Sequence, residues 1–207
     1  GEMAEMPDLY KGEEFDLVGT IVGIVEKEQI LPRPEIKPGD QLISLPSSGL
    51  HTNGYSLVRK IVFEKLKLSL DNYIPECQTT LGEFLLSVHR SYLPLLKEHL
   101  TDPNLNGLAH ITGGGITGNL KRILPEGVSA QIKIKNTEIP PFFHWLQEAG
   151  KLSEETMRET FNLGTGIICI INNESLDEYL SIPEARYLGE LVKQDRIKKK
   201  VEFIQEG

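Results

Sequence analysis

Three glycine-rich loops contain the residue types in this chain that could bind a small anionic molecule or transfer a proton. Their sequences are S-S-G-L-H-T-N-G at 47–54, T-G-G-G-I-T-G at 112–118 and F-N-L-G-T-G at 161–166. The first two loops precede helical patterns, and a helix start presents unpaired N–H groups and the positive end of the helix dipole. Because glycine lets the backbone approach a phosphate closely, these loops predict an anion cradle. A simple turn is the alternative, since glycine is also the usual turn residue.

The polar and glycine residues of these loops are the candidates for substrate binding. They are Ser47, Ser48, Gly49, Asn53, Thr112, Gly113, Gly114, Gly115 and Asn162. His51 is a catalytic candidate because an imidazole titrates near neutral pH; a surface hydrogen bond is the alternative. His110 lies two residues before the second loop and is a second catalytic candidate, unless it only caps a strand end. Glu2, three residues before Glu5, is a candidate metal ligand or a residue that only decorates the chain end.

Other kinds of chemistry find no support in the sequence. Neither helix-preceding loop continues with the G-K-[ST] of a phosphate-binding P-loop, and no Ser-His-Asp or Cys-His arrangement can be argued. The three remaining histidines, His89, His99 and His144, lie in helical patterns and are expected to be structural or solvent-facing. Cys169 stands in an apolar run and is expected in the core. The two cysteines indicate no disulfide framework, which favours a cytoplasmic protein.

Charge and hydropathy limit the possible partners. The formal net charge of −8 argues against nonspecific binding to nucleic acid or to an anionic membrane. No apolar run approaches the ~20 residues that a membrane span needs, and the first residues do not resemble a signal peptide. The sequence opens on glycine without an initiator methionine, so we expect the chain to be part of a longer one.

The elements that must position the loops can be predicted from the hydrophobic pattern. Strands are predicted at 16–25, 40–45, 128–134, 167–171, 187–192 and 200–204. Helices are predicted at 55–67, at 80–99 with a break at Pro94, at 119–124, at 141–149 with Gly150 as its C-cap, and from Ser153 onward. This order predicts an α/β (α+β) fold in which helices pack on a mixed β-sheet.

Several ordered motifs together resemble one enzyme family. G-E-M-A-E-M-P at 1–7, the three loops with A-H before the second, and R-I-L-P at 122–125 follow the order found in aminoimidazole ribonucleotide synthetase, the phosphoribosylformylglycinamidine cyclo-ligase of purine biosynthesis. The likeness covers nearly the whole chain and corresponds to the C-terminal part of that enzyme, which also occurs as the middle unit of a trifunctional protein. Two segments depart from the family pattern: Met3 replaces a usual threonine, and H-R-S-Y at 89–92 stands where T-R-I-Y is common.

The resemblance implies ATP-dependent closure of an imidazole ring in formylglycinamidine ribonucleotide, with ATP and Mg²⁺ required. It implies a homodimer in which a preceding N-terminal domain binds most of the ATP. Residues 1–27 would then be the last piece of that domain, 28–39 a linker and 40–207 the C-terminal α/β domain. The fragment alone is expected to be inactive.

Two other classes of function stay open at this point. The chain could be a binding or regulatory module that keeps the fold without catalysis, which Met3 favours and the retained His51 and Asn53 do not. It could also belong to a related ATP-using enzyme, such as a selenophosphate synthetase or formylglycinamidine ribonucleotide synthetase.

Overall fold

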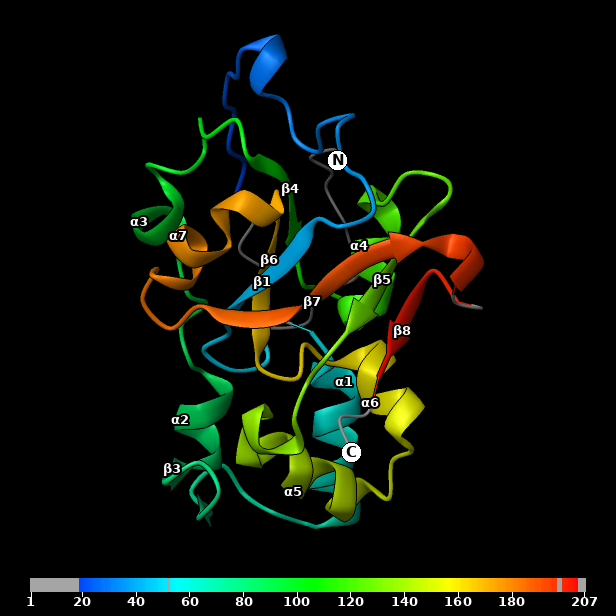
Figure 1. Cartoon of the computed structure of the whole chain (residues 1–207). Coiled ribbons are helices and arrows are strands. Elements are labelled where there is room, and N and C mark those ends of the chain that lie inside the picture. The colour runs from blue at the N-terminus through cyan, green and yellow to red at the C-terminus, as the bar shows by residue number, and fades with distance from the viewer. Residues whose placement is uncertain (1–18, 52, 197–198, 205–207) are drawn as a thin grey trace, which may run out of the picture.

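A six-stranded mixed sheet forms the centre of the molecule (Figure 1). The computed structural model describes residues 19–51, 53–196 and 199–204. The sheet order is β4-β6-β1-β7-β5-β8, and every pairing is antiparallel except that of β5 with β8. The strands are β1 Gln41–Pro46, β4 Leu105–His110, β5 Val128–Ile132, β6 Thr165–Ile171, β7 Arg186–Lys193 and β8 Val201–Phe203. A separate two-stranded hairpin consists of β2 Tyr73–Ile74 and β3 Thr79–Thr80.

Short helices surround the sheet. The α-helices are α1 Tyr55–Arg59, α2 Leu81–Leu85, α3 Leu93–Leu96, α4 Gly115–Ile123, α5 Pro141–Gly150, α6 Glu154–Thr160 and α7 Leu176–Leu180. A π-helical segment, Lys60–Lys65, continues α1. Single 3₁₀ turns lie at Lys27–Gln29, Asn136–Glu138, Asn173–Ser175 and Gln194–Arg196. The predicted mixed α/β architecture is therefore confirmed.

Successive side chains of the central strands pack into two different hydrophobic cores, one on each face of the sheet. On β6, Ile168 and Ile170 point to the face covered by α4, while Cys169 and Ile171 point to the face covered by α3 and α7. Because successive side chains of a strand point to opposite faces, a run of apolar residues is what a sheet covered on both sides requires. The buried position predicted for Cys169 is confirmed.

A third core lies beyond the end of the sheet, where α1, α2, α5 and α6 pack together (Figure 1). Its centre includes the fully buried rings of Phe142, Phe143 and Phe161. Helix α6 begins at the predicted cap, where the Ser153 hydroxyl accepts a hydrogen bond from the Thr156 N–H. The loops 47–54, 112–118 and 161–166 all lead into or out of elements that border this helical layer and the sheet.

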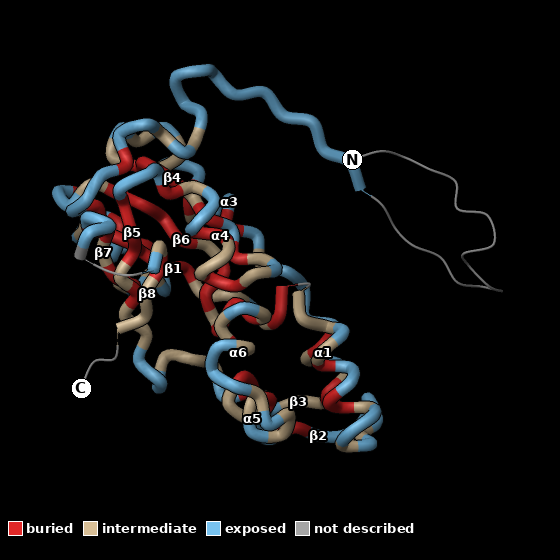
Figure 2. Tube along the Cα trace, turned by 90° about the vertical axis from the view of Figure 1, so that its right-hand side faces the viewer, coloured by how far each residue is buried: buried red, intermediate tan, exposed pale blue. Residues whose placement is uncertain are grey.

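Three details of the predicted elements are wrong. Of the strand predicted at 16–25, residues 16–18 lie outside the described residues and residues 19–25 form no strand. Ile21 and Ile24 are almost fully exposed on a segment that runs away from the body (Figure 2). Pro94 does not break a long helix but stands in the first turn of α3, where its missing N–H costs nothing. Helix α5 includes Gly150, and Lys151 takes the left-handed conformation that ends it.

Strand β4 was not predicted, because its sequence L-N-G-L-A-H has neither strict alternation nor an apolar run. It is an edge strand of the sheet, and its last residue leads directly into the second glycine-rich loop. Within the described residues, no helix is long and apolar enough to cross a membrane.

Candidate functional site

The first and third loops are joined by a buried asparagine. The Asn162 Nδ2 donates to the Gly49 carbonyl (2.8 Å), and its Oδ1 accepts from the Ser47 hydroxyl (3.0 Å) and from the Gly164 N–H (2.8 Å). Only 2% of Asn162 is exposed. Its amide group is thus occupied by protein partners, and its observed role is to hold two loops together.

The first loop also touches the second loop and the end of α6. Asn53 Oδ1 lies 3.3 Å from the point that a Cβ atom on Gly113 would occupy. Gly54 has a φ of +75° and packs so closely on the Phe161 ring that any side chain there would collide with it. All three glycine-rich loops therefore meet in one region.

The glycine triplet does not serve a single purpose. Gly115 is buried, and a Cβ atom there would collide with the Arg158 carbonyl oxygen, so this glycine is needed for packing against α6. The missing side chain at Gly115 thus makes room for the Arg158 backbone. Gly114 has a φ of +94°, which disfavours a side chain through backbone strain. Gly113 is exposed and has no positive φ, so it is the member of the triplet with an open side.

A buried asparagine on α4 fixes the shape of this loop. The Asn119 Nδ2 donates to the Gly115 carbonyl (2.7 Å) and the Thr112 carbonyl (3.2 Å), and its Oδ1 accepts from the Thr112 hydroxyl (3.1 Å). The Thr112 hydroxyl thus donates its hydrogen bond within the protein. Among the described residues, no hydrogen bond from the amides of Gly113 and Gly114 is found, so both N–H groups stay available at the start of α4.

His51 is buried rather than lying on an open loop, with 4% of its surface exposed. Its backbone has the unusual φ of +52°, and its carbonyl accepts a hydrogen bond from Asn53 Nδ2 (2.8 Å). Its Nε2 accepts from the Ser48 N–H (2.9 Å). Because this contact needs a lone pair on Nε2, the neutral ring carries its proton on Nδ1. Within the described residues that Nδ1 atom is buried and has no hydrogen-bond partner.

The protonation state of His51 follows from its surroundings. Burial, followed by the proximity of His89, His110 and Arg90, lowers its pKa to about 4. The ring is therefore neutral at pH 7 and acts as an N–H donor rather than as a cation. Burial and the neighbouring His89 also lower the pKa of His110.

His89 was expected to be a structural or solvent-facing helical residue, and the structure corrects this. It lies in the irregular segment after α2, with its ring stacked on His51 at a centroid distance of 3.9 Å. Its Nε2 lies 3.2 Å from the Nε2 of His110. Segment 86–92 is fastened by two hydrogen bonds between Arg90 and Glu184 (2.9 and 3.0 Å) and by the Tyr92 hydroxyl, which donates to the Pro46 carbonyl.

Sequence reasoning thus missed two residues of this region, Asn119 and His89. Asparagine inside a short helix is a usable signal, because it is a poor helix former unless its side chain has a local role. His89 had no such signal, since only the fold brings it to His51 and His110. Glu2, the candidate metal ligand, lies outside the described residues.

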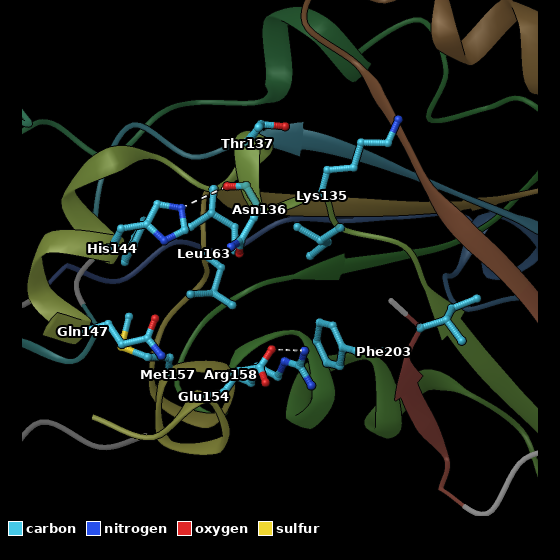
Figure 3. A pocket seen from close by; sticks show the side chains of 14 residues that line it. Lys135, Asn136, Thr137, His144, Gln147, Glu154, Met157, Arg158, Leu163 and Phe203 are labelled. Carbon is cyan, nitrogen blue, oxygen red and sulfur yellow. Dashed lines mark hydrogen bonds and ion pairs between the residues drawn. The ribbon is translucent and has the colours of Figure 1, made fainter. Parts of the chain in front are cut away.

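A separate cavity is lined by residues of α5, α6, the end of β8 and the segment after β5 (Figure 3). It has a volume of about 560 Å³, and Phe143, Met157 and Leu163 contribute to its apolar wall. Arg158 lies at its edge, paired with Glu154 and 4.2 Å from the centre of the Phe203 ring. None of the predicted site residues lines this cavity.

Comparison with known proteins gives the family. Residues 37–202 match the family described as "AIR synthase related protein, C-terminal domain". Curated relatives named phosphoribosylformylglycinamidine cyclo-ligase are 46% identical in Geobacillus kaustophilus over 93% of this chain, 42% in Alkaliphilus oremlandii over 93%, and 40% in Citrifermentans bemidjiense over 99%. The chain spans 57%, 58% and 60% of these relatives, respectively.

The fold is shared with solved structures of low sequence identity. Thiamine-monophosphate kinase from Stenotrophomonas maltophilia superposes with a TM-score of 0.51 at 15% identity, covering 86% of this chain and 54% of that one. A protein from Thermus thermophilus, tt0281, gives a TM-score of 0.50 at 14% identity, covering 82% and 50%. With the family match over most of its length, the chain belongs to the AIR synthase related proteins and contains their C-terminal domain.

Proposed function

We propose that this chain is the substrate-binding part of a phosphoribosylformylglycinamidine cyclo-ligase, which closes the imidazole ring of aminoimidazole ribonucleotide at the expense of ATP. The observation that carries this proposal is the 40–46% identity to relatives of that name over 93–99% of the chain. The meeting of the three loops supports it, because such a reaction depends on positioning and charge neutralisation more than on covalent catalysis.

The ribose phosphate of the substrate is proposed to bind at the start of α4. The amides of Gly113 and Gly114 are available there, and the helix dipole favours an anion. Asn119 pins the loop, so the N–H groups are held in place before the ligand arrives. Ser48, Asn53 and Thr112 remain proposed contacts at the border of the same region.

His51 is proposed to donate a hydrogen bond from Nδ1 to an oxygen of the substrate. Its neutral state, its tautomer and the unpartnered Nδ1 atom support a donor role rather than a general base. His110, at the exposed end of β4, is proposed as the proton-transfer residue. A proton would then move between the substrate and His110, while His51 holds the substrate oxygen through a hydrogen bond.

ATP is proposed to bind mainly to the part of the relatives that precedes the matched region, with residues 1–27 as the end of that domain, 28–39 as a linker and 40–207 as the C-terminal domain. Mg²⁺ prefers oxygen ligands and carboxylates in particular. None of the site candidates that the structure describes is an Asp or Glu, so these residues do not fit Mg²⁺, and no step is assigned to it here. A cytoplasmic homodimer, either stand-alone or as the middle unit of a trifunctional protein, completes the proposal.

The test is a binding experiment with this chain followed by ¹⁵N NMR. Formylglycinamidine ribonucleotide, inorganic phosphate and ATP are titrated separately, and amide shifts are compared between Gly113–Ile116 and the cavity residues Phe143 and Met157. We expect the ribonucleotide and phosphate to shift the α4 start, and ATP to bind more weakly. Tighter binding of ATP than of the ribonucleotide, or shifts confined to the cavity, would contradict the proposed division of labour.

A further inference from the structure

Three histidines from distant parts of the chain form one cluster. His51 belongs to the first glycine-rich loop, His89 to the segment after α2, and His110 to the end of β4. One ring nitrogen of each lies within 4.8 Å of the others. No acidic side chain belongs to this cluster in the part of the chain that the structure describes.

The spacing between two of the rings fits a shared metal ion. In a tetrahedral site with metal–nitrogen bonds of 2.0–2.1 Å, two ligand nitrogens are about 3.3 Å apart. The Nε2 atoms of His89 and His110 are 3.2 Å apart, close to that value. A single N–H···N hydrogen bond is the alternative, but 3.2 Å is at the long limit for one.

The surroundings suit ion entry and ligand orientation. His89 and His110 are both exposed, so an ion can approach them from solvent. The His89 ring is held by its stack on the buried His51 ring, and its neighbour Arg90 is tied to Glu184. Neutral imidazoles without carboxylates select transition metals such as Zn²⁺, Ni²⁺ or Cu²⁺ over Mg²⁺ or Ca²⁺.

From this geometry we infer that the cluster binds one divalent transition-metal ion through the Nε2 atoms of His89 and His110, while the stacked His51 ring supports His89 and is not a ligand. The ion would leave coordination positions open to water, because the protein side offers two nitrogens, one from His89 and one from His110. Binding does not depend on the proposed cyclo-ligase activity. It would, however, occupy His110 and so compete with its proposed role in proton transfer.

The experiment uses the 207-residue chain without a polyhistidine tag, stripped with EDTA and dialysed. Zn²⁺ binding is measured by calorimetry at pH 7.5, and Co²⁺ binding by its visible absorption. The variants are His89→Ala and His110→Ala, with His144→Ala as the matched control. His144 is also a surface histidine, but it lies on α5 and bonds to the Asn136 carbonyl.

We expect one ion per chain, with roughly tenfold or greater loss of affinity in His89→Ala and in His110→Ala and no change in His144→Ala. The imidazole ¹⁵N resonances of the unmodified chain should show Zn²⁺ ligation at Nε2 of His89 and His110, which decides the matter even if a variant fails to fold. Absence of stoichiometric binding, equal affinity of His89→Ala and the unmodified chain, or unchanged Nε2 resonances would overturn the inference.

Discussion

Asn53 connects the histidine loop to the glycine triplet, since its Nδ2 donates to the His51 carbonyl while its Oδ1 lies 3.3 Å from the place of a Gly113 side chain. One amide group therefore holds His51 in its left-handed conformation and borders the start of α4. The proposed donor and the proposed anion site are thus parts of one unit. For substitutions in either loop, both the substrate affinity and the free energy of unfolding should be measured.

Alanine substitutions at the three glycines of the triplet should differ in whether they lower the stability of the protein or its affinity for the ribonucleotide. Gly115→Ala should lower the free energy of unfolding by about 3 kcal/mol or more, because its Cβ atom would collide with backbone. Gly114→Ala should cost about 1–2 kcal/mol through its φ of +94°. Gly113→Ala should cost less than about 1 kcal/mol yet weaken binding of the ribonucleotide. Urea unfolding and calorimetric titration of the three variants check this order; a Gly115→Ala protein as stable as Gly113→Ala would contradict it.

His51→Gln should impair turnover while keeping the fold. A glutamine amide oxygen can replace Nε2 as the acceptor for the Ser48 N–H, but it supplies no donor at the place of Nδ1. Cyclisation by a protein that also carries the preceding domain of the relatives should fall roughly 10²–10³-fold, as expected for the loss of one preorganised hydrogen-bond donor. Because His51 is buried, His51→Ala should in addition lose stability, unlike a residue on an open loop. Near-normal turnover of His51→Gln would remove the donor role.

Asn162→Ala should loosen two loops at once. The change removes the acceptor of the Ser47 hydroxyl and the Gly164 N–H and the donor to the Gly49 carbonyl, all in a buried place. We expect a loss of about 2–4 kcal/mol in the free energy of unfolding. Asn173→Ala, on an exposed turn, serves as the control and should change little. If Asn162→Ala keeps its stability but loses substrate binding, Asn162 is a ligand contact instead of a clip.

The lowered pKa of His51 predicts a loss of stability in mild acid. In the unfolded chain a histidine titrates near 6.5, whereas folded His51 titrates at about 4. Between these values the unfolded state binds more protons, so the free energy of unfolding falls as the pH falls from 6.5 to 4, by at most about 3 kcal/mol. Urea unfolding at several pH values in EDTA, with His51→Gln as reference, measures it. A variant with the same pH dependence as the unmodified chain would refute the assignment.

The hydrophobic pattern predicted the central strands correctly because their apolar residues are the ones that the fold buries. The run I-I-C-I-I at 167–171 has apolar residues on both faces, and both faces are covered. The same rule failed at 19–25, where an equally apolar segment has no neighbour within the described chain and forms no strand. Strand β4 was not predicted because its local preference for a strand is weak. It forms a strand because it pairs with β6.

The sequence allowed us to predict the individual loops of the site, but not how their residues are arranged relative to one another. Glycine and polar residues marked all three loops, and the structure brings the loops together. The separate duties of Gly113, Gly114 and Gly115 depend on which atoms face each position, and no local pattern contains that information. His89 shows the same limit, because the ring that stacks on His51 comes from a segment 38 positions further along the chain.

The π-helical segment Lys60–Lys65 determines where the chain can lose a residue without disturbing the packing of α1. Its upstream end is set by Gly54 against Phe161, and its own residues pack against α5. A π turn accommodates about one residue more than an α turn, and each residue turns a helix by about 100°. Deleting a single residue here could therefore restore an ordinary α-helix locally without rotating the anchored ends, whereas a deletion within α1 would swing Val58 out of the core. Natural variation in chain length should accordingly collect in this one turn.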